Sequence, residues 1–264
     1  MKIYLIIVHI IMSLYLGGGI VLSLAHQFKT DWGMGIKDFT SPWKKFSYLW
    51  VILFIPLLFF TQELFPWSEF HGNKEVYFTL SYVILRLFFY WIGTMVATLF
   101  IERKPYLSLI IYFFIGNFLA FDWAMSLEGH WFSNMYGFLY LASGVAGAIS
   151  FFIMTKFEKT SKKGRIDLSH LLITTTIIWL YLNFSQFIIM WMANLPREVI
   201  WYIVRFDYLK LLYGFMILKI LPLLSIAFFH DLKTSPKVMR IVSSLTFLGS
   251  LLEMFWIIYP GGHS

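Results

Sequence analysis

Residues 3–25 read IYLIIVHIIMSLYLGGGIVLSLA, a continuous apolar stretch without a charged side chain. A helix of about 20 apolar residues is long enough to cross the ~30 Å hydrocarbon core of a bilayer. Seven more stretches of similar length and hydropathy follow along the chain. The eight predicted spans are 3–25, 46–65, 77–101, 106–122, 132–155, 169–193, 207–229 and 238–259.

The composition agrees with a membrane protein. Of the 264 residues, 59% are hydrophobic and only 13% are charged, whereas a soluble domain of this length carries roughly a quarter of charged residues. There is no cysteine, which excludes disulfides, thiolate zinc sites, cysteine-ligated iron–sulfur clusters and cysteine catalysis. We therefore predict an all-α integral membrane protein with a single domain (residues 1–264), divided into two four-helix bundles at roughly 1–122 and 123–264.

Basic residues predict the orientation in the membrane, because cytoplasmic loops are enriched in Lys and Arg. The odd-numbered loops contain Lys29, Lys37, Lys44, Lys45, Arg103, Lys104, Lys156, Lys159, Lys162, Lys163, Arg165, Lys233, Lys237 and Arg240. The even-numbered loops and the termini contain only Lys2, Lys74, Arg197 and Arg205. We therefore expect both termini, and the segments 122–131 and 194–207, on the outer face of a bacterial cytoplasmic membrane.

Ionisable side chains within spans cost several kcal/mol unless they are paired or hydrated, so they are candidate functional residues. Arg86 and Lys219 lie near the middle of the third and seventh predicted spans. Glu63 and Glu253 lie near the outer ends of the second and eighth. For the two basic residues, a structural ion pair and a functional role are both open. For the two acids, interfacial placement is the alternative.

Segment 122–133 combines several groups that transfer protons. Asp122, Glu128, His130 and Ser133 follow one another within twelve residues at the predicted outer face. Carboxylates, an imidazole and a hydroxyl together are suited to a proton relay or to binding a quinol hydroxyl. A capped re-entrant loop would have the same composition.

Asn183 and Gln186 are three residues apart and so share a face of the sixth predicted helix. They form either a polar stripe for a quinone carbonyl or a water chain, or amide hydrogen bonds between helices. The histidines are not spaced for a haem within the membrane, and no metal site or bound cofactor is predicted.

Four segments resemble one known family. Residues 122–137 (DWAMSLEGHWFSNMYG) and 183–198 (NFSQFIIMWMANLPRE) are similar to two motifs of the ActF subunit of bacterial alternative complex III. The stretch from Tyr77 through Arg86 to Tyr90, and the final residues 253–260 (EMFWIIYP), resemble two further motifs. ActF belongs to the wider NrfD-like, polysulfide-reductase-type membrane subunits.

The resemblance implies a cofactor-free membrane subunit of a quinol:cytochrome c, or quinol:electron-acceptor, oxidoreductase. Its partners would be an NrfD-like paralogue, an iron–sulfur subunit, c-type cytochromes and a haem–copper oxidase. Haem c and iron–sulfur clusters would belong to those partners. The chain would support assembly and proton transfer beside the quinol-oxidising subunit, and it would not be catalytic alone.

Three alternatives remain open at this stage. The chain itself binds quinol, as NrfD-type anchors do; it is an unrelated secondary transporter; or it is a structural scaffold. A transporter would purify alone, whereas a respiratory subunit would bring haem-containing partners with it.

Overall fold

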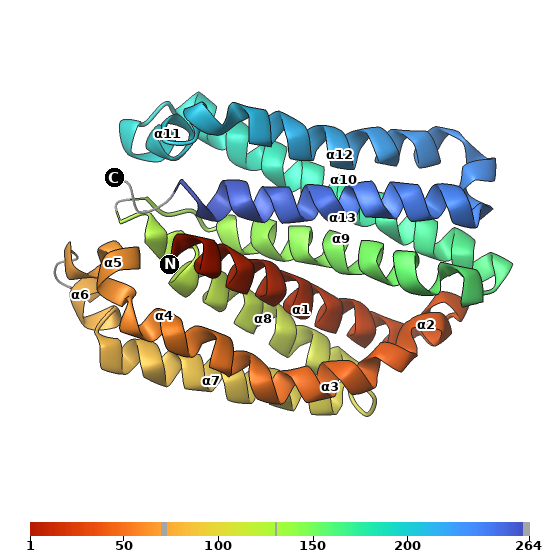
Figure 1. The fold of residues 1–264 in the computed structure, drawn as a ribbon, viewed down its shortest axis with the longest axis horizontal. Coiled ribbons are helices and arrows are strands. Elements are labelled where there is room, and N and C mark those ends of the chain that lie inside the picture. Colours follow the sequence, from red (N-terminus) through yellow and green to blue (C-terminus); the bar gives the residue numbers. More distant parts are fainter. Residues whose placement is uncertain (70–72, 130, 261–264) are drawn as a thin grey trace.

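A computed structural model describes residues 1–69, 73–129 and 131–260 (Figure 1). It is 88% helical and has no strand in the part of the chain that it describes. Eight helical segments are long and apolar enough to cross a membrane. The predicted all-α, multi-pass membrane fold is therefore confirmed.

Most of the spans are single helices. They are α1 (Lys2–Phe28), α7 (Leu80–Phe100), α8 (Pro105–Trp123), α9 (Tyr136–Lys156), α10 (Lys162–Ala193), α12 (Leu209–Phe228) and α13 (Pro236–Ile258). Short helices at the ends of the bundle are α5 (Thr61–Leu64), α6 (Asn73–Tyr77) and α11 (Pro196–Ile203).

The second span differs from the prediction of 46–65. It runs over Asp31–Phe59 and is built of α2 (Asp31–Ile36), the 3-10 turn η1 (Lys37–Phe39), α3 (Thr40–Leu49), the 3-10 turn η2 (Trp50–Phe54) and α4 (Ile55–Phe59). The hydropathy of residues 31–45 is too low to predict a span, but buried Trp32 and Ile36 hold this part helical against the bundle. Glu63 consequently lies beyond the span, in α5.

The helices form two groups of four. In the first group, α1, α3, α7 and α8 each pack against the next helix, and α8 closes the ring on α1. The second group repeats this order with α9, α10, α12 and α13. The groups meet mainly where α1 packs along α9, and α8 adds a further contact to α9 (Figure 1).

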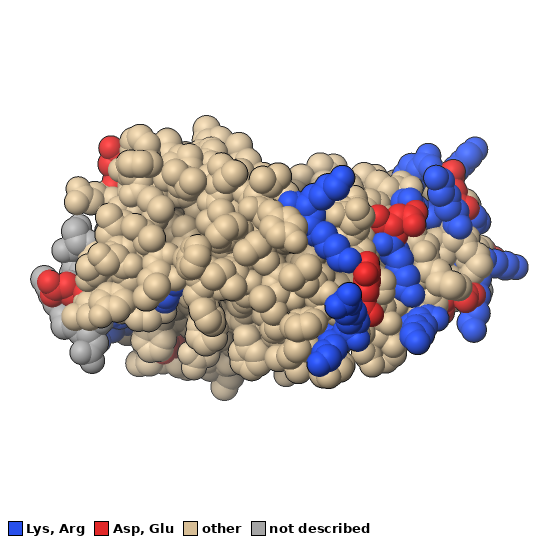
Figure 2. Space-filling model, turned by 90° about the horizontal axis from the view of Figure 1, so that it is seen from below, with Lys and Arg blue, Asp and Glu red and all other residues tan. Residues whose placement is uncertain are grey.

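Charged side chains separate the two ends of the bundle. Figure 2 shows Lys and Arg gathered at the end that holds α2 and the turns after α7, α9 and α12, which we call the basic end. The other end, which we call the opposite end, holds α5, α6, α11 and the start of α1. The surface between them carries few charged side chains (Figure 2), as expected for the part of the protein in contact with lipid.

Two glycines allow α1 and α9 to touch along their backbones. A Cβ atom on Gly17 would collide with backbone atoms of Gly144, and a Cβ atom on Gly144 would collide with the backbone carbonyl of Ser13. Membrane helices associate through such close contacts because lipid offers no hydrophobic driving force between helices. The contact between the two groups therefore depends on the absence of a side chain at both positions.

Substitution at this contact should destabilise the protein. We expect Gly144→Leu to cost about 2 kcal/mol or more, because the helices must move apart to admit the side chain. Gly214→Leu in α12 is the matched control, since a Cβ there meets no atom within 4 Å. Thermal unfolding in detergent should show a clear loss for Gly144→Leu and little change for Gly214→Leu. Equal losses would contradict this account.

Candidate functional site

A buried ion pair lies within the second group of helices. Lys219 of α12 is paired with Glu253 of α13, and neither side chain is more than 1% exposed. Ser143 of α9 donates a hydrogen bond to the same carboxylate oxygen, and Trp179 of α10 donates to the other oxygen at 2.7 Å. Each helix of the group contributes one side chain to this cluster, which we call the buried centre.

Local packing makes room for the lysine. Lys219 lies roughly 15 Å from either end of α12 at 1.5 Å per residue, so its ammonium group is too deep to reach water along the helix. A Cβ atom at Gly249 of α13 would lie 2.9 Å from Cγ of Lys219, so glycine there leaves space for the lysine side chain. The ammonium nitrogen also lies 4.2 Å from the centroid of the Trp179 ring, where a cation–π contact adds stabilisation.

The partners of the buried centre explain how two charges persist inside a membrane. Moving a charge out of water costs several kcal/mol, which is offset only by a close counter-charge and further hydrogen bonds. Glu253 has three donors: Lys219, Ser143 and Trp179. Lys219 also donates to the Ser143 hydroxyl at 3.1 Å. The centre is therefore a paired, hydrogen-bonded acid and base that can exchange a proton.

A second buried carboxylate lies toward the opposite end, at the last turn of α8. Arg86 Nε lies 2.6 Å from Oδ2 of Asp122. Tyr90 donates to the same oxygen at 2.7 Å, and Tyr77 donates to Oδ1 at 2.8 Å. Asp122 is 3% exposed, so its charge is balanced by an arginine and two phenols rather than by solvent.

Tyr77 is the part of this site that lies outside the spans. Its burial and the nearby Asp122 carboxylate raise the pKa of Tyr77 to about 12. The hydroxyl therefore stays protonated at physiological pH and remains a donor to Asp122. The guanidinium of Arg86 stacks on its ring, 3.7 Å from the centroid, and Arg86 Nη1 donates to the Tyr77 carbonyl at 2.7 Å.

A third ion pair joins two connecting segments of the second group at the opposite end of the bundle. Arg205, just after α11, lies 2.7 Å from Glu128, and both are buried. Arg205 also donates to the backbone carbonyls of Trp201 and Ile257. Its guanidinium stacks on the Trp201 ring at 4.1 Å from the centroid. Arg205 thus ties the segment between α11 and α12 to the segment before α9 through Glu128 and to the end of α13 through Ile257.

The acids of segment 122–133 therefore have separate partners. Asp122 is bound by Arg86 and Glu128 by Arg205, so these two acids do not share a site. His130, predicted to act together with them, is outside the described residues. The sequence brings the acids close along the chain, but the helix end at Trp123 and the turn that follows direct them to different helices.

The polar side chains of α10 act independently of one another. Gln186 accepts a hydrogen bond from Ser133 at 2.8 Å, which ties α10 to the segment before α9. Asn183 donates to the Trp179 carbonyl of its own helix at 3.0 Å. Gln186 thus bonds to the segment before α9 and Asn183 within its own helix, and the choice between a polar stripe and interhelical amide bonding stays open.

The structure refines the positions of two candidate charges, and one buried arginine was missed. Glu63 is exposed, because the second span ends before it. Arg86 lies six residues after the start of α7, so it is in the half of the span that faces the opposite end. Arg205, which the sequence places in a loop, is 1% exposed. The sequence signal for its burial was that Arg205 lies within the apolar run that begins at Val199.

A buried histidine connects the two groups of helices. His9 of α1 contacts the Tyr140 hydroxyl at 3.2 Å through Nδ1 and the Trp123 carbonyl at 3.0 Å through Nε2. A carbonyl only accepts hydrogen bonds, so Nε2 carries the proton. His9 therefore lies beside the residue that follows Asp122. Tyr140 precedes Ser143 of the buried centre by one turn of α9.

No group of three or more His, Asp or Glu that could hold a metal ion occurs within the described residues. Comparison with models of known protein families and with curated proteins finds no match to this chain.

The buried centre makes a testable contribution to stability. Lys219→Met should cost about 3–5 kcal/mol because it leaves the Glu253 carboxylate buried without its counter-charge. The double variant Lys219→Met/Glu253→Leu removes both charges and should recover most of that loss. A thermal or denaturant unfolding cycle in detergent measures the coupling. Additive losses would show that the two side chains do not stabilise each other.

Proposed function

We propose that this chain is a membrane subunit of a bacterial quinol:electron-acceptor oxidoreductase, in which it supports assembly and moves protons beside a quinol-oxidising subunit. The observation that carries the proposal is the buried centre, since an acid and a base are retained deep in the membrane at a substantial energetic cost. The four segments that resemble ActF provide the link to alternative complex III.

The arrangement of titratable groups suits proton transfer between the two ion-paired regions. Asp122 adjoins Trp123, whose carbonyl contacts His9. His9 contacts Tyr140, which lies one helical turn from Ser143 and so from the buried centre. Water is needed to connect groups that are not in direct contact. Under the proposal, protons pass between the Asp122 site and Glu253 by this route.

The distribution of charge gives the proposed orientation. The basic end faces the cytoplasm of a bacterial inner membrane, following the rule for Lys and Arg in loops. Both termini and the Asp122 site then face the periplasm. There the chain would adjoin partner subunits that carry haem c and iron–sulfur clusters, next to an NrfD-like paralogue and, in some assemblies, a haem–copper oxidase.

A second role, quinol binding within this chain, is favoured by one observation. In the described part of the protein, Arg205 Nε and the indole nitrogens of Trp201 and Trp256 are buried without a hydrogen-bond acceptor. The Trp201 and Trp256 ring centroids are 5.0 Å apart, and the Arg205 guanidinium carbon lies 4.1 and 5.9 Å from them. Three neighbouring side chains thus have unused donors, from which a carbonyl oxygen such as that of a quinone could accept a hydrogen bond. Organic extraction of the purified complex and detection of quinone crosslinked near Trp201 would support this role.

Purification tests the assembly part of the proposal. An affinity-tagged chain expressed in its native host should elute with c-type haem absorbance and with iron–sulfur and cytochrome subunits identifiable by mass spectrometry. Elution of the chain alone under mild detergent would reject the proposal and favour a transporter.

Substitution tests the proton-transfer part. Glu253→Gln/Lys219→Met removes the acid and the base together, so no charge is left unpaired. In the purified complex reconstituted into vesicles, we expect assembly and haem content to persist while proton release coupled to quinol oxidation falls by roughly tenfold or more. Asp122→Asn combined with His130→Ala should also lower it.

Glu63→Gln is the matched control, because this carboxylate is exposed and lies at the same end of the bundle as Asp122. It should leave proton release unchanged. If the buried and the exposed variants behave alike, the mechanism is wrong, whatever the result of the purification.

A further inference from the structure

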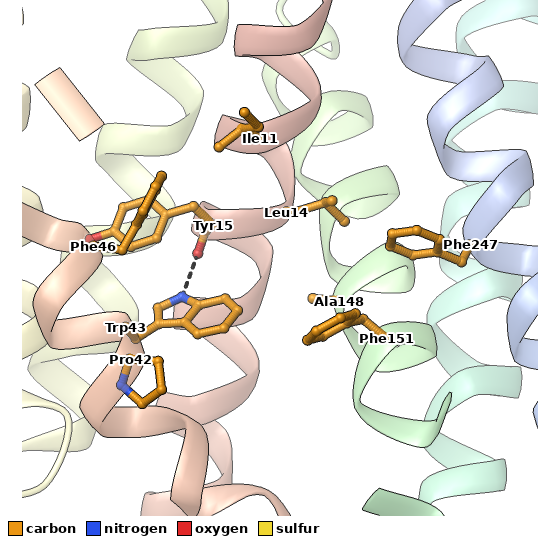
Figure 3. Close-up of a pocket in the computed structure, with 9 residues that line it drawn as sticks. All are labelled: Ile11, Leu14, Tyr15, Pro42, Trp43, Phe46, Ala148, Phe151 and Phe247. Atoms are coloured by element: carbon orange, nitrogen blue, oxygen red, sulfur yellow. Dashed lines mark hydrogen bonds between the residues drawn. The ribbon is translucent and has the colours of Figure 1, made fainter. Parts of the chain in front are cut away.

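An apolar cleft lies where the two groups of helices meet. Figure 3 shows α3 on one side of it and α13 on the other, with α1 and α9 between them. Its volume is about 410 Å³, within the ~300–1,000 Å³ range of small-molecule sites. The lining includes Leu14, Trp43, Phe151 and Phe247.

The polar atoms of the lining are directed elsewhere. Trp43 donates its indole N–H to the Tyr15 carbonyl at 3.0 Å (Figure 3). The Tyr15 hydroxyl contacts Thr98 of α7 at 3.3 Å, on the side of α1 away from the cleft. The cleft therefore presents hydrocarbon and aromatic surface only, which suits an apolar chain.

A small polar notch lies between the ends of α9 and α13 at the basic end. It has a volume of about 60 Å³ and is lined by Thr155 of α9, by Glu158 and Lys159 of the 3-10 turn η5 (Phe157–Lys159), and by Pro236 and Arg240 at the start of α13. Arg240 is paired with Glu158 at 2.6 Å, but both side chains are more than half exposed. Lys159 is exposed as well. These cations are therefore accessible to a ligand from the membrane surface.

The cleft and the notch lie on the same faces of α9 and α13. Ala148 lines the cleft and Thr155 the notch, seven residues apart on α9; Phe247 and Arg240 have the same spacing on α13. Seven residues correspond to about two helical turns, or roughly 10 Å along the axis. An apolar site and a basic polar site thus follow one another in the direction of the membrane normal, as do the tail and headgroup of a lipid.

Charge complementarity selects an anionic headgroup. The ends of η1, α9 and α13 next to the notch carry five cations (Lys37, Lys156, Lys159, Lys237, Arg240) and two carboxylates (Asp38, Glu158), a net charge of 5 − 2 = +3. Lys156 is adjacent to the cleft itself, because its ammonium lies 5.5 Å from the centroid of the Phe39 ring, which contacts Trp43 and Phe151.

We propose that this cleft and notch bind one anionic phospholipid of the membrane leaflet at the basic end. An acyl chain lies in the cleft between α3 and α13, and the phosphate lies at Lys159 and Arg240. A lipid held there contacts both groups of helices, so it would strengthen their association beyond the contact of Gly17 with Gly144.

Native mass spectrometry of the full chain in detergent tests the site, with dioleoylphosphatidylglycerol and dioleoylphosphatidylcholine as probes. We expect one retained phosphatidylglycerol molecule and much weaker retention of phosphatidylcholine. Lys159→Gln/Arg240→Gln should weaken phosphatidylglycerol binding by about fivefold for each cation removed. Leu14→Trp should abolish retention of either lipid by filling the cleft, and Ile11→Phe is a milder variant of the same kind.

Matched controls separate the site from general lipid contact. Ile177→Trp places the same bulk on an exposed face of α10, and Lys104→Gln with Lys163→Gln removes two exposed cations elsewhere at the basic end. Both should leave retention unchanged, and Lys159→Arg/Arg240→Lys should preserve it. Equal binding of the two lipids, or full retention by Leu14→Trp and Ile11→Phe when folded, overturns the proposal. Equal binding is also the expected result if a partner helix, rather than a lipid, covers the cleft.

Discussion

The ion pair between Lys219 and Glu253 constrains four helices at once. Each charge needs the other, because neither can reach water from its depth in the membrane. The pair in turn needs Ser143 and Trp179 to complete the hydrogen bonds of the carboxylate. α12 and α13 thus cannot slide or rotate relative to α9 and α10 without leaving a buried charge uncompensated. The ion pair and its hydrogen bonds therefore fix how the four helices of the second group align along their axes.

The first group has a neutral cluster between its helices, apart from the ion pair of Arg86 with Asp122 at its end. Tyr15 of α1, Thr98 of α7 and Tyr112 of α8 contact one another through their hydroxyls. A tryptophan of the second span, Trp50, donates to Thr94, one turn from Thr98 on α7. In the second group, α9, α10, α12 and α13 contribute Ser143, Trp179, Lys219 and Glu253, respectively. Each group therefore holds a cluster to which all four of its spans contribute, neutral in the first group and ionised in the second.

Much of the fold could be predicted from the sequence because lipid imposes a simple rule on it. Long apolar runs reveal the spans, and only the second was seriously misplaced, because residues 31–45 are helical despite their polar composition. The positions of Lys219 and Glu253 as candidate charges were also apparent. Their pairing was not, since 34 residues separate them and nothing in the local sequence indicates which helices adjoin. The same limit applies to Arg205, which stabilises Glu128 across 77 residues.

The difference between the two groups bears on how protons would move. A neutral cluster of tyrosine and threonine hydroxyls can pass a proton along hydrogen bonds but offers it no stable resting place, whereas a glutamate can hold one. If both groups conducted, an acid would be expected at both centres. Only the second has one, and His9 connects it through Tyr140 with the region of Asp122 at the end of the first group. A single route that begins in the first group and enters the second is therefore more consistent with the chemistry of these side chains than two parallel routes. Under the proposed proton transfer, the close contact of α1 with α9 at Gly17 and Gly144 would serve transfer as well as packing, because it keeps His9 within reach of Tyr140.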